Sequence, residues 1–284
     1  MAQGRAVEYA ALADLSAAGA VSHWVAGADG VGLHVLEYGK SSPGSAAPVV
    51  VVPGITMPAF GMDFVAAQLA RDRQVFVLDV RGRGLSQSAP TYSIGDYARD
   101  LAAVCDALGL QGAVFVGHSM GARIVAAAAA SGMPGRGWVI VDPPLSGPGR
   151  APYPTSLEAF VGQVEEAYRG ATFEEVAASW PRWPARELEI RTRWLPSCDL
   201  DAVAATHLGF ETEDFLPFWQ QVPSPVVFIR GSDSPVVTDS SMEEVRAVRP
   251  DAVYREIPDA GHMVFWDNVD GALSCLVDAV RETG

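Results

Sequence analysis

The sequence has 284 residues, of which 49% are hydrophobic and 19% charged, a composition typical of a globular protein with enough apolar material for a large core. This length fits one α/β domain with an inserted cap. The formal net charge of −14 argues against nucleic-acid binding and against anionic membrane surfaces, because both require a basic protein surface. A small anionic substrate is still compatible, because surface charges are screened beyond about 8–10 Å and local arginines can set the field in a pocket.

The cysteines and the first residues indicate the cellular compartment. Cys105, Cys198 and Cys275 lie far apart without a C-x-x-C pair, which favours a reducing compartment and no disulfide framework. Residues 1–20 lack the basic start and apolar run of a signal peptide, and we expect a peripheral, alanine-rich helical extension there. No apolar stretch reaches the roughly 20 residues of a membrane span. The sequence therefore predicts a cytoplasmic protein, and its oligomeric state is left open.

Strands and helices alternate through the first half of the chain. Two short strands are predicted near 21–26 and 32–37, joined by the Asp29-Gly30 turn. Apolar runs then predict strands that are buried on both faces, at 48–54, 74–80, 112–117 and 138–142. Helical spacing between them predicts helices at 60–70, 92–108 and 120–130, the second capped by Ser93.

The alternation of predicted strands and helices stops at residues 143–224, which contain proline clusters and segments with helical spacing. It resumes with a strand at 225–231, a helix at 239–248, a strand at 252–258 and a helix at 269–282. Such alternation predicts a parallel sheet wrapped by helices. We therefore expect a core domain formed by 1–142 and 225–284, and a helical cap, 143–224, over the carboxyl ends of the strands.

A G-x-S-x-G motif at residues 117–121 lies between a predicted strand and a predicted helix, the context that a nucleophilic serine requires. The chain must turn sharply at Ser119, so residues two positions away cannot carry bulky side chains. The turn places the backbone N–H of Met120 where an oxyanion would form. The N–H of Ile55, in the loop after the run of four valines, is the expected second donor.

His262 is the expected base, because it lies on a loop after the last predicted strand and completes the order serine, acid, histidine. Two aspartates are candidates for the acid that orients its imidazole. Asp233 lies after the strand 225–231, but Ser234 holds the position where many hydrolases carry the acid. Asp142, at the carboxyl end of the preceding strand, is the candidate that we favour, and the other aspartate is then a turn-capping residue.

These features predict the α/β-hydrolase fold, with a mostly parallel central sheet, flanking helices and an inserted helical cap. The chain further resembles the N-formylmaleamate deformylases of bacterial nicotinate breakdown. The similar segments are VPGIT at 52–56, VLDVRGRGLS at 77–86, GHSMGAR at 117–123, VDPPLSGPGR at 141–150 and AGHMVFWDNVDG at 260–271. A more distant resemblance is to the hydrolase of acetamidomethylene-succinate in vitamin B6 breakdown.

The resemblance implies a triad of Ser119, His262 and Asp142 that removes formate from an N-formyl amide through an acyl-enzyme. No cofactor is expected, and no cluster of ligand residues has metal-binding spacing. The implied substrate is a small anion and needs a cationic partner. If the chain is another enzyme, the alternative activity is hydrolysis of an ester or a carbon–carbon bond in a carboxylated substrate. If it is not an enzyme, the alternative is a non-catalytic ligand-binding protein of this fold.

Arg123 is a candidate partner for the substrate carboxylate, because it lies one helical turn after Ser119. Further candidates for substrate contact lie in the predicted cap: Arg150, Tyr153 and Trp183. Arg81 and Arg83, in the loop after a buried strand, are expected to fix that loop.

Overall fold

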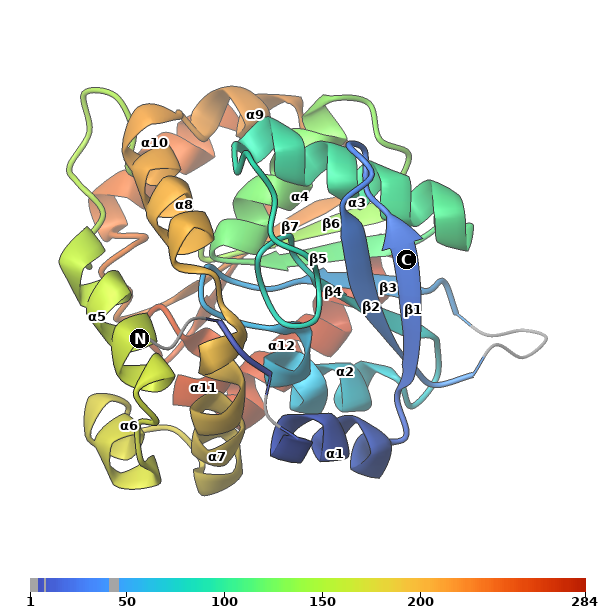
Figure 1. Cartoon of the computed structure of the whole chain (residues 1–284). Helices are drawn as coiled ribbons and strands as arrows, with labels where there is room; N and C mark the ends of the chain where they lie inside the picture. Colours follow the sequence, from blue (N-terminus) through green and yellow to red (C-terminus); the bar gives the residue numbers. More distant parts are fainter. Residues whose placement is uncertain (1–4, 8, 41–45) are drawn as a thin grey trace.

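The computed structural model describes residues 5–7, 9–40 and 46–284 (Figure 1). Within these residues eight strands form one sheet in the order β1-β2-β4-β3-β5-β6-β7-β8. The strands are β1 (Val21–Ala26), β2 (Gly32–Tyr38), β3 (Val49–Val52), β4 (Val75–Asp79), β5 (Val114–His118), β6 (Gly137–Val141), β7 (Val226–Gly231) and β8 (Val253–Ile257). The pairs β1–β2 and β2–β4 are antiparallel, and every later pair is parallel. The fold class predicted from the sequence is confirmed.

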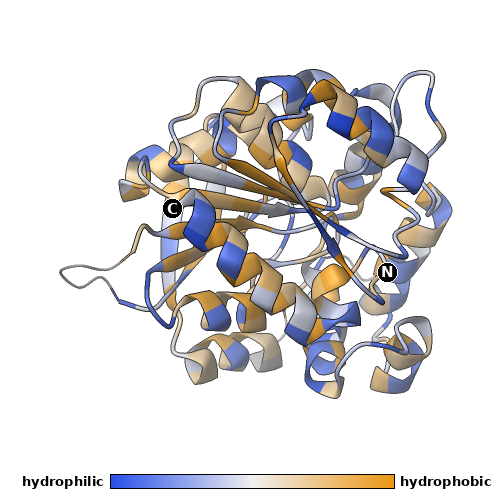
Figure 2. Ribbon diagram, turned by 180° about the vertical axis from the view of Figure 1, so that it is seen from behind, coloured by the Kyte–Doolittle hydropathy of each residue, from blue (hydrophilic) through white to orange (hydrophobic). Residues whose placement is uncertain are grey.

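Helices cover both faces of the sheet (Figure 1). One layer contains α3 (Ile94–Leu108), α4 (Met120–Ala130), α9 (Leu216–Gln221) and α10 (Asp239–Val248). The other contains α1 (Tyr9–Ala18), α2 (Asp63–Leu69), α11 (Val264–Asp267) and α12 (Val269–Thr283). Figure 2 shows the apolar strands enclosed between these layers and the polar residues on the outer sides of the helices.

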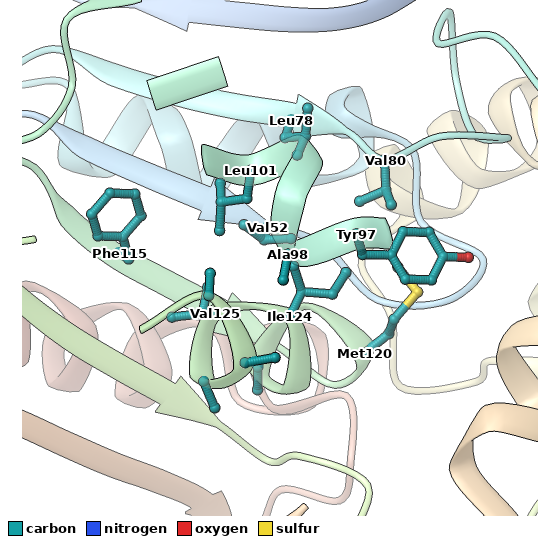
Figure 3. Close-up of a cluster of buried hydrophobic side chains, with 14 of the residues drawn as sticks. Val52, Leu78, Val80, Tyr97, Ala98, Leu101, Phe115, Met120, Ile124 and Val125 are labelled. Carbon is teal, nitrogen blue, oxygen red and sulfur yellow. The ribbon is translucent and has the colours of Figure 1, made fainter. Parts of the chain in front are cut away.

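The strand alternation divides the apolar residues between two cores, one on each face. In β3, Val50 and Val52 face the layer of α3 and α4, whereas Val49 and Val51 face the layer of α2 and α12. All four side chains are fully buried, which explains the uninterrupted run of valines in the sequence. Figure 3 shows part of the first core, where strand residues meet α3 and α4: Val52, Leu78, Val80, Tyr97, Ala98, Leu101, Phe115, Met120, Ile124 and Val125.

Two local predictions differ from the structure. The helix expected at 60–70 begins as a 3-10 turn, Ala59–Met62, before α2. The tight turn forms because Gly61 N–H donates to Pro58 O at 2.9 Å, while Asp79 accepts the N–H of Ala59 at 2.6 Å. The helix α1 lies within the extension expected at 1–20, of which residues 1–4 and 8 lie outside the described residues. It is integral rather than peripheral, because Ala11 and Leu15 are buried in the second core.

The segment between β6 and β7 is helical, as predicted. It contains α5 (Leu157–Tyr168), α6 (Phe173–Ser179), α7 (Ala185–Trp194), a 3-10 turn (Leu195–Ser197), α8 (Leu200–Thr212) and α9. Figure 1 shows α5 to α8 gathered at one end of the sheet. By contrast, α9 packs beside α4, and its buried Trp219 donates from Nε1 to Val245 O of α10 at 3.0 Å. The division into a core domain and a cap at residues 142 and 225 stays a prediction.

None of the described helices combines the length and apolar character that a bilayer crossing needs. The cytoplasmic location stays a prediction.

A buried ion pair fixes the loop after β4 to α3. Arg81 donates from Nε to Asp100 Oδ2 at 2.6 Å and from Nη2 to Oδ1 at 2.8 Å, and both side chains are almost inaccessible to solvent. Such a two-bond contact holds the guanidinium in one orientation. The sequence-based expectation that Arg81 fixes this loop is confirmed.

Asp100→Asn leaves the buried Arg81 charge with the 3.3 Å contact from Nη2 to Asp29 Oδ2 as its ion pair, so we expect the free energy of unfolding to fall by about 3 kcal/mol. The matched change Asp106→Asn, on an exposed position of the same helix, should alter it by less than about 0.5 kcal/mol. Urea unfolding followed by circular dichroism measures both values. Equal stability of the two variants would show that the pair does not hold the loop.

Candidate active site

Ser119 lies on a tight turn between β5 and α4, with φ 56° and ψ −121°. A side chain other than glycine reaches this region only where its surroundings hold it there. The flanking glycines explain how the turn fits. A Cβ on Gly121 would lie 1.9 Å from Val52 O, and a Cβ on Gly117 would lie 2.2 Å from Gly121 O. The spacing of the motif therefore follows from backbone contacts with β3 and α4.

The structure brings Ser119, His262 and Asp142 into one hydrogen-bonded chain. Ser119 Oγ lies 2.9 Å from His262 Nε2, and Asp142 Oδ1 lies 2.8 Å from His262 Nδ1. Asp142 directly follows β6, and His262 lies in the loop between β8 and α11. With Nδ1–H donating to the carboxylate, Nε2 is free to accept the proton of the serine hydroxyl. The arrangement can therefore activate Ser119 as a nucleophile.

Asp142 is fully buried and is held by donors from β7 and the loop that follows it. Gly231 N–H donates to Oδ2 at 2.9 Å, and Ser234 Oγ donates to Oδ1 at 2.6 Å. Ser234 is itself oriented, because the N–H groups of Val236 and Val237 each donate to its oxygen at 3.2 Å. These contacts satisfy a buried carboxylate that would otherwise be costly. The role of Ser234 could not be deduced from the sequence, which shows only that an acid is absent there.

Asp233, the other candidate acid, is exposed. Its carboxylate accepts a hydrogen bond from Ser232 Oγ at 3.1 Å, and within the described residues it makes no hydrogen bond to His262. The structure therefore places Asp142, and not Asp233, against the imidazole.

His118, the residue directly before Ser119, contacts His262. Its Nε2–H donates to the backbone oxygen of His262 at 2.9 Å, and the two rings stack with centroids 5.3 Å apart. Burial lowers the pKa of His118 to about 3, so its ring is neutral. His118 is thus a packed neutral residue that supports the loop of His262.

The two expected oxyanion donors lie on either side of Ser119. Met120 begins α4, so its N–H has no acceptor within the helix. Ile55 follows Gly54, which approaches so closely that a Cβ there would lie 3.6 Å from Ser119 Oγ. Arg83 fixes the Ile55 peptide, because its Nε donates to Ile55 O at 3.0 Å. Both residues thus lie next to Ser119, and the oxyanion hole formed by their N–H groups stays a prediction.

A cavity of about 530 Å³, including its opening to solvent, lies at Ser119 and His262. Core loops and the segment between β6 and β7 both contribute to its wall: Gly54, Ile55, Thr56, Met57, His118, Ser119, Tyr153, Thr155, Phe160, Gln163, Trp180, Arg191, His262 and Met263. The Tyr153 hydroxyl lies 3.3 Å from His262 Nε2. Burial raises the pKa of Tyr153 above its ordinary value, so the hydroxyl keeps its proton and can donate to a ligand.

Three of the predicted substrate contacts lie outside this cavity. Arg123 is buried and donates from Nη1 to the backbone oxygens of Pro144 and Ser146 at 3.2 and 3.3 Å. Its guanidinium therefore lies at the loop after β6. Arg150 pairs with Glu244 of α10, with Nη1 2.6 Å from Oε2. Trp183 stacks on Trp266 with ring centroids 4.9 Å apart and lines neighbouring cavities.

Arg191 lines the cavity from α7 and was not predicted from the sequence. Its helix carries two further arginines, Arg186 and Arg193, and helical spacing alone does not tell which of the three faces Ser119. Among the described residues no cluster of histidine, cysteine, aspartate or glutamate is arranged to hold a metal ion.

A mostly parallel sheet that carries a serine after β5, an aspartate after β6 and a histidine after β8 defines an enzyme of the α/β hydrolase class. The chain belongs to the alpha/beta hydrolase fold family, because a sequence model of that family matches residues 47–269.

Two relatives and one solved structure indicate a narrower relationship. The chain is 37% identical to N-formylmaleamate deformylase of Pseudomonas putida, over 91% of this chain and 97% of that protein. It is 28% identical to 2-(acetamidomethylene)succinate hydrolase of Mesorhizobium japonicum, over 88% of this chain and 93% of that protein. The crystal structure of the N-formylmaleamic acid deformylase Nfo from Pseudomonas putida S16 aligns with a TM-score of 0.83 at 34% identity, covering 90% of this chain and all of that one. The resemblance predicted from the sequence is confirmed.

Asp142→Asn should lower kcat for an activated ester, such as 4-nitrophenyl acetate, by about 10³–10⁴-fold, because the imidazole loses the acceptor that fixes its tautomer. Asp233→Asn removes an exposed carboxylate in the adjacent loop and should change kcat by less than about twofold. Steady-state kinetics of both variants decide between the two aspartates. A large loss in Asp233→Asn alone would assign the acid to Asp233.

Proposed function

We propose that this chain is a serine amidase that removes the formyl group of N-formylmaleamate, releasing maleamate and formate through an acyl-enzyme. The observation that carries the proposal is the hydrogen-bonded chain of Ser119, His262 and Asp142 at the wall of a cavity that opens to solvent. The near full-length similarity to N-formylmaleamate deformylase supports the choice of substrate.

In the first step His262 takes the proton of Ser119, and Oγ attacks the formyl carbonyl. The 2.9 Å contact between Oγ and Nε2 supports this transfer. The negative charge that develops on the carbonyl oxygen accepts hydrogen bonds from the N–H groups of Ile55 and Met120. Loss of one such donor typically costs about 10²–10³ in rate.

In the second step the protonated His262 donates to the amide nitrogen, and the C–N bond breaks. The products are maleamate and a formyl ester on Ser119. The leaving nitrogen also carries the maleamate carbonyl, which delocalises its electron pair and makes departure easier than from a simple amide. Asp142 stabilises the imidazolium throughout, because its carboxylate lies 2.8 Å from Nδ1.

In the last step His262 removes a proton from water, which attacks the formyl ester. Formate leaves as the imidazolium returns its proton to Ser119 Oγ.

Purified protein supplied with N-formylmaleamate should release one formate for each molecule consumed, measured with formate dehydrogenase. Ser119→Ala should reduce the rate by at least about 10³-fold, because the hydroxyl that forms the ester is absent. A panel of neutral esters and ring-fission diketones, assayed alongside, tests the alternative hydrolases. Faster turnover of any member of that panel than of N-formylmaleamate would contradict the proposed substrate.

A further inference from the structure

Arg191 lies in the wall of the Ser119 cavity with an exposed fraction of only 5%. Its Nη2 donates to Gln163 Oε1 at 3.1 Å and to Thr56 Oγ1 at 3.4 Å, and its Nη1 donates to Thr56 O at 3.4 Å. The ring centroids of Trp180 and Trp183 lie 5.1 and 5.6 Å from the guanidinium carbon. The group is therefore held in place by aromatic faces and by neutral acceptors.

The charge of Arg191 is not balanced by a neighbouring acid. Within the part of the chain that the structure describes, no carboxylate forms an ion pair with it, in contrast to buried Arg81 on Asp100. Burial lowers the pKa of Arg191 to about 10, so the guanidinium is still charged at neutral pH. A buried charge without an opposite charge is costly, and a bound anion would offset that cost.

Arg191 itself gives the cavity wall a positive charge, although the whole chain carries a net charge of −14. Among the described residues of the wall, Arg191 is the one with a permanent charge, and aspartate, glutamate and lysine do not occur. A guanidinium offers five N–H donors in a planar fork that matches a carboxylate. Its contacts with Gln163 and Thr56 use donors on Nη1 and Nη2, and no hydrogen bond to a described residue involves Nε.

Arg191 also lies close to the expected oxyanion site. It donates to both the backbone and the hydroxyl of Thr56, which directly follows Ile55 in the chain. Because Thr56 is the next residue after Ile55, an anion on Arg191 and a carbonyl at the Ile55 N–H fit the two ends of one small molecule. The amide of a small dicarboxylic acid has these two groups at its ends.

We propose that Arg191, assisted by Gln163 and Thr56, binds the carboxylate of the substrate and selects acids over neutral amides of the same shape. The identity of the acid, maleamate, rests on the proposed function. The presence of a carboxylate site rests on the burial and contacts of Arg191. The aromatic pair Trp180 and Trp183 positions the guanidinium.

Maleamate and its neutral counterpart, the diamide of maleic acid, provide the direct test, because binding requires no turnover. Isothermal titration calorimetry of the full chain should show at least about tenfold tighter binding of maleamate than of the diamide. Arg191→Gln should remove this difference. Arg193→Gln is the matched control on the same helix, since its Nε donates to Asp14 of α1 at 2.9 Å, and it should keep the full difference.

Arg191→Lys retains a charge without the planar fork and should keep part of the preference. Circular dichroism and phosphonate labelling of Ser119 verify that each variant is folded. Equal affinity of the unmodified protein for the acid and the diamide would overturn the inference, as would a preference that survives in folded Arg191→Gln.

The result is separable from the proposed function. An Arg191-dependent preference for maleamate without formate release would leave the carboxylate site standing and refute the deformylase. Formate release without a preference for maleamate would support the deformylase and refute the carboxylate site.

Discussion

The backbone turn at Ser119 is the constraint on which the rest of the site depends. The serine adopts φ 56°, and its N–H donates to Val141 O of the neighbouring strand at 2.9 Å. Gly121 allows α4 to begin directly against the end of β3, where any Cβ would meet Val52 O. Because the turn is held from both sides, the hydroxyl has one position, and the oxyanion donors and the imidazole can be arranged around it.

The location of the acid follows from the order of the sheet. Strands β6 and β7 are hydrogen-bonded neighbours, so residues after either strand lie at the same edge, within reach of one histidine. Here the carboxylate comes from Asp142 after β6, and the loop after β7 contributes Ser234 as a donor to it. The imidazole requires an oriented acceptor, and the strand that supplies it matters less than the distance.

Sequence patterns predicted those parts of the molecule that depend on local constraints. The uninterrupted valines of β3 indicated a strand buried on both faces, and the spacing of Gly117, Ser119 and Gly121 indicated the turn, because each follows from backbone geometry. The substrate contacts were not predictable in this way. Arg123 and Arg191 are both buried arginines on helices, and only the packing of α7 against Thr56 and Gln163 places one of them at the cavity.

The protein combines a serine that we propose as the nucleophile with a pocket that carries the positive charge of Arg191. Labelling with a fluorophosphonate followed by peptide mass spectrometry tests most directly whether His262 activates Ser119. We expect one adduct, on Ser119, that forms at least about 10²-fold more slowly in His262→Ala. An adduct on another residue, or an unchanged labelling rate in His262→Ala, would contradict the account.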